Sequence, residues 1–122
     1  YQFAVQCLDV RYDGLMSDVR NAIQKSRVSL SGGKEPCAKA LKPVFGFDVV
    51  LNLLVAPEKH KTSSSTRILA SSLLAQAIGQ VDEAIRTLNA SWLSDATLNL
   101  GEAAKQYIAA KKAYSAELEQ SK

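Results

Sequence analysis

The sequence between residues 74 and 88 reads LAQAIGQVDEAIRTL, and its large apolar residues fall at alternating steps of four and three. These positions are Leu74, Ile78, Val81, Ile85 and Leu88. Such spacing keeps apolar side chains on one face of a helix and is typical of a seam packed against other helices. The same spacing recurs near the C-terminus, at Leu100, Ala103, Tyr107, Ala110 and Tyr114. The two seams predict an all-α helical bundle, with Ile78, Val81 and Ile85 in its core.

The length and composition are those of a single globular domain. The chain has 122 residues, of which 47% are hydrophobic and 22% charged, with a formal net charge of +3. Basic residues gather only at Lys59, His60, Lys61 and Arg67. A nucleic-acid-binding surface needs a larger basic cluster than this, so we expect no nucleic acid partner. No apolar stretch approaches the ~20 residues that span a membrane.

The first segment leaves two alternatives open. Apolar residues between positions 4 and 26 keep near one helical face, which favours one continuous helix. The dipeptide Asp13-Gly14 is a turn signal, which favours a break. We prefer the break. The prediction is an N-terminal arm or short extra helix over residues 1–14 and a four-helix bundle over residues 15–122.

The second helix is ambiguous in the sequence. Apolar residues at every second position from Phe45 to Val55 are typical of a strand. A helix is preferred because no other segment offers this strand a partner. Pro43 and Gly46 should kink the helix or delay its start, and Pro57 should end it. The segment is interpreted by default as the central helix of the bundle; the alternative is a face awaiting a partner or an apolar ligand.

Polar connections are expected over residues 58–66 and 89–99, with helices between and after them. The expected topology is an up-down-up-down bundle. Cys7 and Cys37 fit neither a disulfide framework nor a metal motif. Their pairing stays open: one straight first helix would hold them too far apart, whereas a break at Asp13-Gly14 would allow a bridge.

No catalytic motif stands out. His60 is the only histidine and is expected at the surface, where its replacement by alanine would leave stability nearly unchanged. One histidine and two distant cysteines make no metal site. We therefore expect no enzyme activity, catalytic residue, metal or cofactor.

Docking on a protein partner is the expected activity. The predicted arm carries apolar residues without an assured place in the bundle, and the basic connection carries the one local excess of positive charge. Trp92 lies just outside the seams, where it either caps the end of the bundle or contacts a partner. The candidate docking residues are Phe3, Val5, Leu8, Lys59, His60, Lys61, Arg67 and Trp92.

Three stretches together resemble PsbQ-type extrinsic subunits of photosystem II, which are small helical bundles on the lumenal side of the thylakoid. Residues 15–20, LMSDVR, resemble the opening of that family's first bundle helix. Residues 72–84 resemble its third helix, and residues 103–107 with Leu118 resemble its last. The resemblance implies a non-catalytic subunit that docks on a membrane complex from outside.

The expected function is therefore that of an accessory protein that docks on a larger, membrane-associated complex, such as photosystem II, and stabilises it. The alternatives are a carrier of an apolar small molecule within the bundle and a secreted protein-binding or inhibitor module. The chain begins at Tyr1 rather than Met, which favours an exported or organelle-lumen protein, the thylakoid lumen included.

Overall fold

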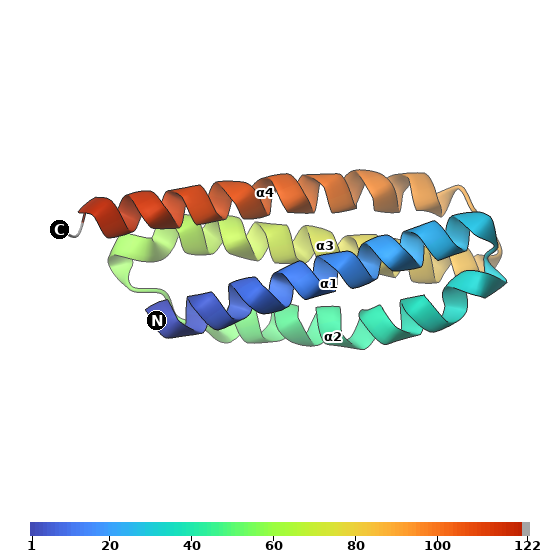
Figure 1. Cartoon of the computed structure of the whole chain (residues 1–122), viewed down its shortest axis with the longest axis horizontal. Coiled ribbons are helices and arrows are strands. Elements are labelled where there is room, and N and C mark those ends of the chain that lie inside the picture. The colour runs from blue at the N-terminus through green and yellow to red at the C-terminus, as the bar shows by residue number, and fades with distance from the viewer. Residues whose placement is uncertain (121–122) are drawn as a thin grey trace.

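The chain folds into an all-α four-helix bundle, seen in a computed structural model that describes residues 1–120 (Figure 1). The long helices are α1 (Gln2–Val28), α2 (Lys34–Leu53), α3 (Lys61–Thr87) and α4 (Trp92–Gln120). Short 3₁₀ turns, η1 (Ser31–Gly33) and η2 (Glu58–His60), precede α2 and α3. Successive helices run in opposite directions, so the predicted up-down-up-down topology is confirmed. No described helix is long and apolar enough to cross a membrane.

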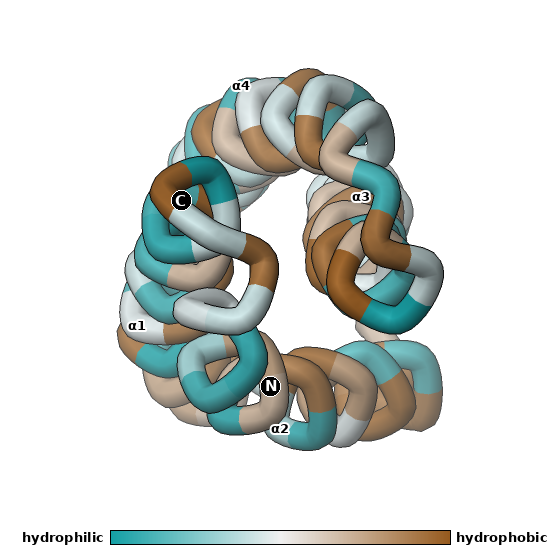
Figure 2. Tube along the Cα trace, turned by 90° about the vertical axis from the view of Figure 1, so that its right-hand side faces the viewer, coloured by the Kyte–Doolittle hydropathy of each residue, from teal (hydrophilic) through white to brown (hydrophobic). Residues whose placement is uncertain are grey.

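Viewed along its axis, the bundle is a ring of four helices, with α2 opposite α4 (Figure 2). The most extensive packing is between α3 and α4. Both predicted seams lie in the core, where Val81 and Ile78 are fully buried. Leu88 is the one seam residue whose predicted place in the core is wrong. It follows the end of α3 with a left-handed φ of 54°, and its side chain is 78% exposed.

The predicted N-terminal arm is wrong, because α1 continues through Asp13-Gly14 without a break. The buried positions on both sides of Gly14 share one face, and packing along that face outweighs the local turn preference. Val5 and Leu8, which were expected to be free for docking, are buried instead. The predicted division between an arm over residues 1–14 and a bundle over residues 15–122 is therefore absent from the structure, where residues 14 and 15 lie within α1.

Helix α2 forms as preferred over the strand, but it is not a central helix. It lies on the perimeter of the ring, with Val44, Phe47 and Leu51 facing the core. Pro43 lies within α2 without ending it. Because a four-helix ring has no central member, the side of α2 opposite Phe47 faces solvent.

The connections are shorter than predicted. Helix α3 begins at Lys61 and α4 begins at Trp92, so much of each expected polar loop is the first turns of a helix. The hydroxyl residues at positions 62–66 are helical, and Thr66 donates a hydrogen bond to the carbonyl of Thr62.

Two tyrosines tie the helices together at mid-bundle. The Tyr12 hydroxyl lies 3.0 Å from the carbonyl oxygen of Ala70 and 3.3 Å from that of Ala103. The Tyr107 hydroxyl donates to the carbonyl of Asp9 at 2.8 Å. Burial raises the pKa of both hydroxyls, so they stay neutral donors.

Candidate functional site

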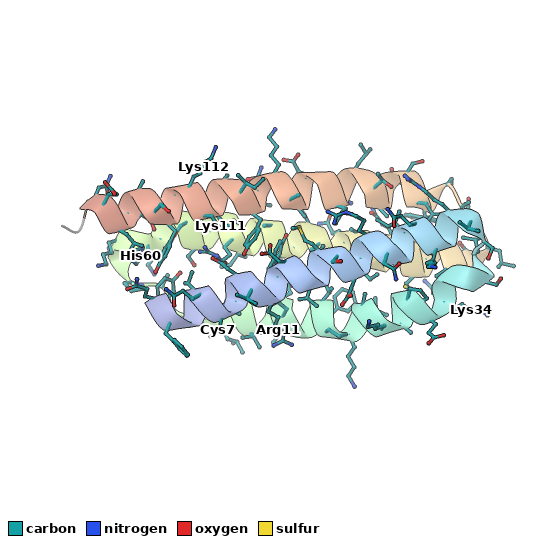
Figure 3. All side chains as sticks on the ribbon, in the orientation of Figure 1. Cys7, Arg11, Lys34, His60, Lys111 and Lys112 are labelled. Carbon is teal, nitrogen blue, oxygen red and sulfur yellow. The ribbon has the colours of Figure 1, made fainter. Side chains whose placement is uncertain are left out.

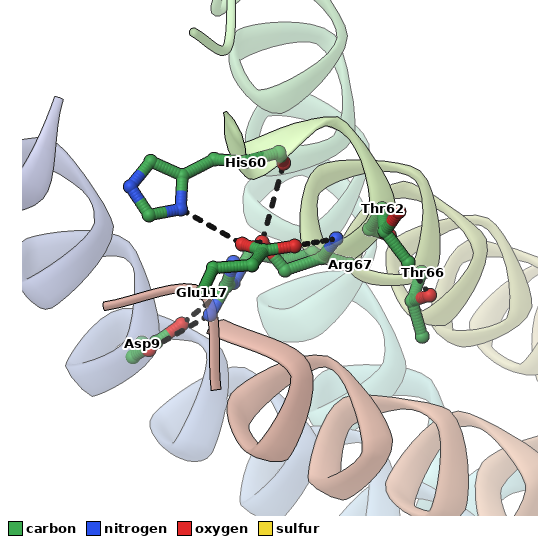
Figure 4. A network of polar contacts seen from close by, with 7 residues as sticks. Asp9, His60, Thr62, Thr66, Arg67 and Glu117 are labelled. Carbon is green, nitrogen blue, oxygen red and sulfur yellow. Dashed lines mark hydrogen bonds and ion pairs between the residues drawn. The ribbon is translucent and has the colours of Figure 1, made fainter. Parts of the chain in front are cut away.

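A cluster of charged and polar side chains lies at the end of the bundle where α1 begins and α4 ends (Figure 4). We call it the polar cluster, and its members are Asp9 of α1, His60 of η2, Ser63 and Arg67 of α3, and Glu117 of α4. His60, Ser63, Arg67 and Glu117 are buried, with Arg67 only 1% exposed. Charged residues are rarely buried unless they are paired, so the pairing decides what this cluster does.

Glu117 joins the end of α4 to the start of α3. Its carboxylate lies 2.7 Å from Nδ1 of His60 and accepts a hydrogen bond of 2.6 Å from the Ser63 hydroxyl. It also accepts the backbone N–H of Ser63, the third residue of α3, at 3.0 Å. The first N–H groups of a helix have no partner within the helix and carry a partial positive charge. Glu117 therefore caps α3 from another helix.

Arg67 and Asp9 form the second pair of the cluster. Nε and Nη2 of Arg67 donate to the two carboxylate oxygens of Asp9 at 3.0 and 3.2 Å, a bidentate geometry. The Arg67 side chain is 1% exposed, whereas that of Asp9 is 23% exposed. The pair thus holds a buried cation against a carboxylate that keeps some contact with water.

Aromatic rings close the cluster toward the start of the chain. The Tyr1 ring stacks on the His60 ring with centroids 5.5 Å apart. The Tyr114 ring is tilted against the same His60 ring, with centroids 4.7 Å apart. The Arg67 guanidinium lies over the Tyr114 ring. Nη1 of Arg67 and the hydroxyl of Tyr114 are buried without a hydrogen-bond partner within residues 1–120.

Serine, histidine and glutamate are the residue types of a hydrolytic triad, but their arrangement here is different. A triad needs the serine hydroxyl on a histidine nitrogen, with the carboxylate on the other nitrogen. Here Glu117 lies between the two, and the Ser63 hydroxyl donates to the carboxylate. The geometry is that of a helix cap. No group of three or more His, Cys, Asp or Glu side chains in residues 1–120 is placed to hold a metal ion.

The surface placement predicted for His60 is wrong, and so is the docking role predicted for Arg67. Both side chains are buried, because Glu117 and Asp9 give them partners inside the bundle. We therefore expect His60→Ala to lower the free energy of unfolding, whereas the surface placement predicted almost no change. Lys59 and Lys61 are exposed, as predicted.

The remaining docking candidates separate to opposite ends of the molecule. Phe3 is 78% exposed and lies at the same end as Lys59 and Lys61. Trp92, at the start of α4, is 36% exposed and lies at the far end. Helix α4 has 29 residues, and a helix of 29 residues is about 40 Å long. One small partner therefore does not contact both Phe3 and Trp92.

An apolar groove, which we call the α1–α2 groove, lies between the start of α1 and the end of α2. Its volume is about 530 Å³. It is lined by Phe3, Ala4, Cys7 and Leu8 on one side and by Val50, Leu53 and Leu54 on the other. Cys7 and Arg11 lie beside each other along the α2 side of α1 (Figure 3).

Both cysteines are free thiols. Cys7 is exposed in the groove, while Cys37 is buried near the other end of the bundle. Because α1 is one helix, it separates the two thiols, which resolves the alternative left open by the sequence. Burial, with a smaller contribution from Asp82, raises the pKa of Cys37 to about 11.

The apolar lining continues onto the solvent side of α2. Phe45, Val49 and Leu53 follow one another at steps of four and are 44%, 58% and 76% exposed. The same side of the first half of α2 carries Lys39 and Lys42. The outer face of this helix therefore changes from polar to apolar at about its midpoint.

The cap formed by Glu117 makes a pH-dependent contribution to stability. Burial alone would raise its pKa, but hydrogen bonds from Ser63 and His60 and the charge of His60 outweigh this, and the pKa lies below its usual value of 4.5. A carboxyl group with a lowered folded pKa stabilises the fold above its unfolded pKa and loses that effect as pH falls through the folded value.

We therefore expect Glu117→Gln to lower the free energy of unfolding by about 2 kcal/mol near neutral pH. The difference from the parent protein should shrink as pH falls below 4.5. Urea unfolding over a pH series measures this, with Glu119→Gln, an exposed change on the same helix, as the control. A difference that stays constant down to the lowest pH would contradict the cap.

Comparisons with family models, with curated proteins and with solved structures found no match to this chain. The functional argument therefore depends on the geometry described above.

Sequence reasoning missed the polar cluster, although a signal was present. Arg67 lies seven residues before Leu74, and Glu117 lies three residues after Tyr114. Both charges thus fall on direct extensions of the two predicted seams. A charged residue in register with a core seam is a candidate for a buried ion pair, and a search for such residues would have found both.

Proposed function

We propose that this protein is a non-catalytic accessory protein that docks on a larger protein complex through the apolar surface of α1 and α2. The observation that carries the proposal is the exposed apolar half of α2 beside the α1–α2 groove. Phe3, Val49, Val50 and Leu53 are each at least half exposed there. A helix on the surface of a bundle ordinarily keeps polar residues on its solvent side.

The size of the apolar surface supports the same proposal. The exposed fractions of these four residues and Phe45 range from 44% to 78%, so together they present on the order of 500 Å² of apolar area. The largest apolar patch on a typical monomeric protein is about 300–600 Å² and often serves an interaction, and this surface is of that size. Burial on a partner would remove the patch from water.

The geometry of the polar cluster also favours a role without catalysis. Ser63, His60 and Glu117 are engaged in holding α3 and α4 together, as described above. The resemblance to PsbQ-type subunits extends the proposal to a membrane-associated complex such as photosystem II and to the thylakoid lumen as the compartment.

A photo-crosslinking experiment tests the proposal. Cys7 is the exposed thiol of the groove, so a benzophenone maleimide attached there should react with whatever docks on this surface. The labelled protein is added to an extract of its source cells, and crosslinked proteins are identified by mass spectrometry. The identified partner is then purified and its binding measured with the unlabelled protein.

We expect the partner to bind the parent protein and Leu98→Glu, but not Leu53→Glu. Leu98, on α4, is 72% exposed and is thus a matched control for Leu53. Equal binding by both variants would overturn the proposed surface. A stoichiometric apolar molecule retained in the purified protein would instead favour the carrier function.

A further inference from the structure

We propose that the occupant of the α1–α2 groove is an amphipathic helix of a partner protein that carries acidic residues beside its apolar stripe. This inference rests on the proposed function and names the class of partner. It is carried by three features: the spacing of the groove's apolar walls, the glycines beyond the ends of these walls, and the charge of the rim.

The apolar walls have helical spacing on both sides. Phe3 and Cys7 are one turn apart on α1, and Val50 and Leu53 are one turn apart on α2. The two helices are antiparallel neighbours, so both rows of apolar residues run along the bundle axis (Figure 1). An amphipathic helix presents apolar residues at the same one-turn repeat, which is the basis of helix-in-groove recognition.

Beyond the apolar lining of the groove, α1 and α2 each carry a glycine on the same face. Continuing along the same faces, Gly14 lies seven residues after Cys7, and Gly46 lies four residues before Val50. A Cβ atom added at either glycine would meet no atom within 4 Å. The absence of side chains here adds room for a second helix to approach the backbones of α1 and α2 closely.

Basic side chains surround the apolar walls. Arg11 lies one turn beyond Cys7 on α1, and Lys42 lies one turn before Gly46 on α2. Lys39 and Lys59 extend this basic rim at its two ends, and all four are exposed. None of them forms an ion pair within residues 1–120. Acids also lie on these faces: Glu35 one turn before Lys39, Glu58 next to Lys59, and the partly buried Asp18 one turn beyond Gly14. The excess positive charge nearest the apolar walls is therefore that of Arg11 and Lys42. Complementary charge therefore calls for an acidic partner.

The same features disfavour two other occupants. A two-fold contact between copies of this chain would bring each basic rim close to its own symmetry mate. A bilayer receives the convex apolar face of a helix, whereas part of the apolar lining here is concave. A helix with acidic flanks satisfies both the shape and the charge.

Binding of designed peptides to the purified full chain tests the inference. The first peptide is a helix of about five turns with leucines on one face and glutamates beside them. The second has lysines in place of the glutamates, and the third has the first peptide's composition in scrambled order. Affinity is measured by calorimetry, and occupancy is measured as protection of Cys7 from a thiol reagent. Cys37 is buried and serves as an unreactive internal reference.

We expect the acidic amphipathic peptide to bind at least tenfold more tightly than the other two and to protect Cys7. Leu53→Glu should weaken binding at least tenfold, and the matched Leu98→Glu should not. Arg11→Glu combined with Lys42→Glu should weaken binding and reduce its salt dependence. Lys112→Glu, an exposed change on α4, is the matched charge control.

Four results would overturn the inference. Equal binding of the acidic and basic peptides would remove the role of the rim. A dimer in sedimentation that Leu53→Glu dissociates would identify a second copy as the occupant. Binding to phosphatidylglycerol vesicles without peptide binding would identify a membrane. If the peptides fail while the crosslinked partner still binds through Leu53, the helical partner is wrong and the docking function stands.

Discussion

Replacing Val81 with aspartate should abolish the cooperative thermal unfolding of the bundle. Val81 is fully buried on α3, which packs against all three other helices. An ionised carboxylate at this position would have no partner, and its desolvation would cost more than a domain of this size has in total stability, about 5–15 kcal/mol. Protonating the carboxylate would still leave a polar group in place of a packed valine.

Circular dichroism in the far ultraviolet, followed during heating, measures this effect. The parent protein should give a helical spectrum and one cooperative transition, and the variant should give none. Gln76→Asp introduces the same charge at an exposed position of the same helix, and we expect it to keep the transition. A Val81→Asp protein that melts within a few degrees of the parent would contradict the core position of the seam.

The fold class was predictable because the seams of α3 and α4 are long and regular. Each seam repeats over several turns, and the burial of its members outweighs any single local preference. Leu74 and Tyr107 illustrate this, since both are buried where the spacing placed them. Leu88 was not predictable in the same way, because the register does not indicate where a helix ends.

The first and second helices were harder to predict because local and long-range signals conflict in them. Asp13-Gly14 is a turn signal when considered alone, but packing on both sides keeps α1 continuous. In α2, apolar residues occur around the whole helix, so the pattern does not indicate which of them face the core. Phe47 is buried and Val49 is exposed, a distinction that only the arrangement of the bundle provides.

The polar cluster depends on contacts between residues that are far apart in the chain. His60 and Glu117 are 57 residues apart, and Asp9 and Arg67 are 58 apart. A single sequence indicates that a charge falls on a seam, but it does not indicate which opposite charge will meet it. His60 therefore looked like a surface residue in a basic connection.

Replacing Asp9 with alanine should lower the free energy of unfolding by about 3–5 kcal/mol, because it leaves the buried Arg67 cation without its partner. Both donors of Arg67 that face Asp9 would lose their acceptors. Nη1 of Arg67 already lacks a partner within residues 1–120, so no spare hydrogen bond compensates. Urea unfolding at neutral pH measures the loss.

The two sides of the pair should respond unequally. Arg67→Met removes the buried charge and keeps much of the side-chain volume, while Asp9 retains access to water through its 23% exposed side chain. We therefore expect Arg67→Met to cost less than Asp9→Ala, and the double variant to be more stable than Asp9→Ala alone. Asp13→Ala, an exposed change one turn along α1, should be nearly neutral. A double variant no more stable than Asp9→Ala would show that the loss comes from the Asp9 side chain itself, and not from an uncompensated charge at Arg67.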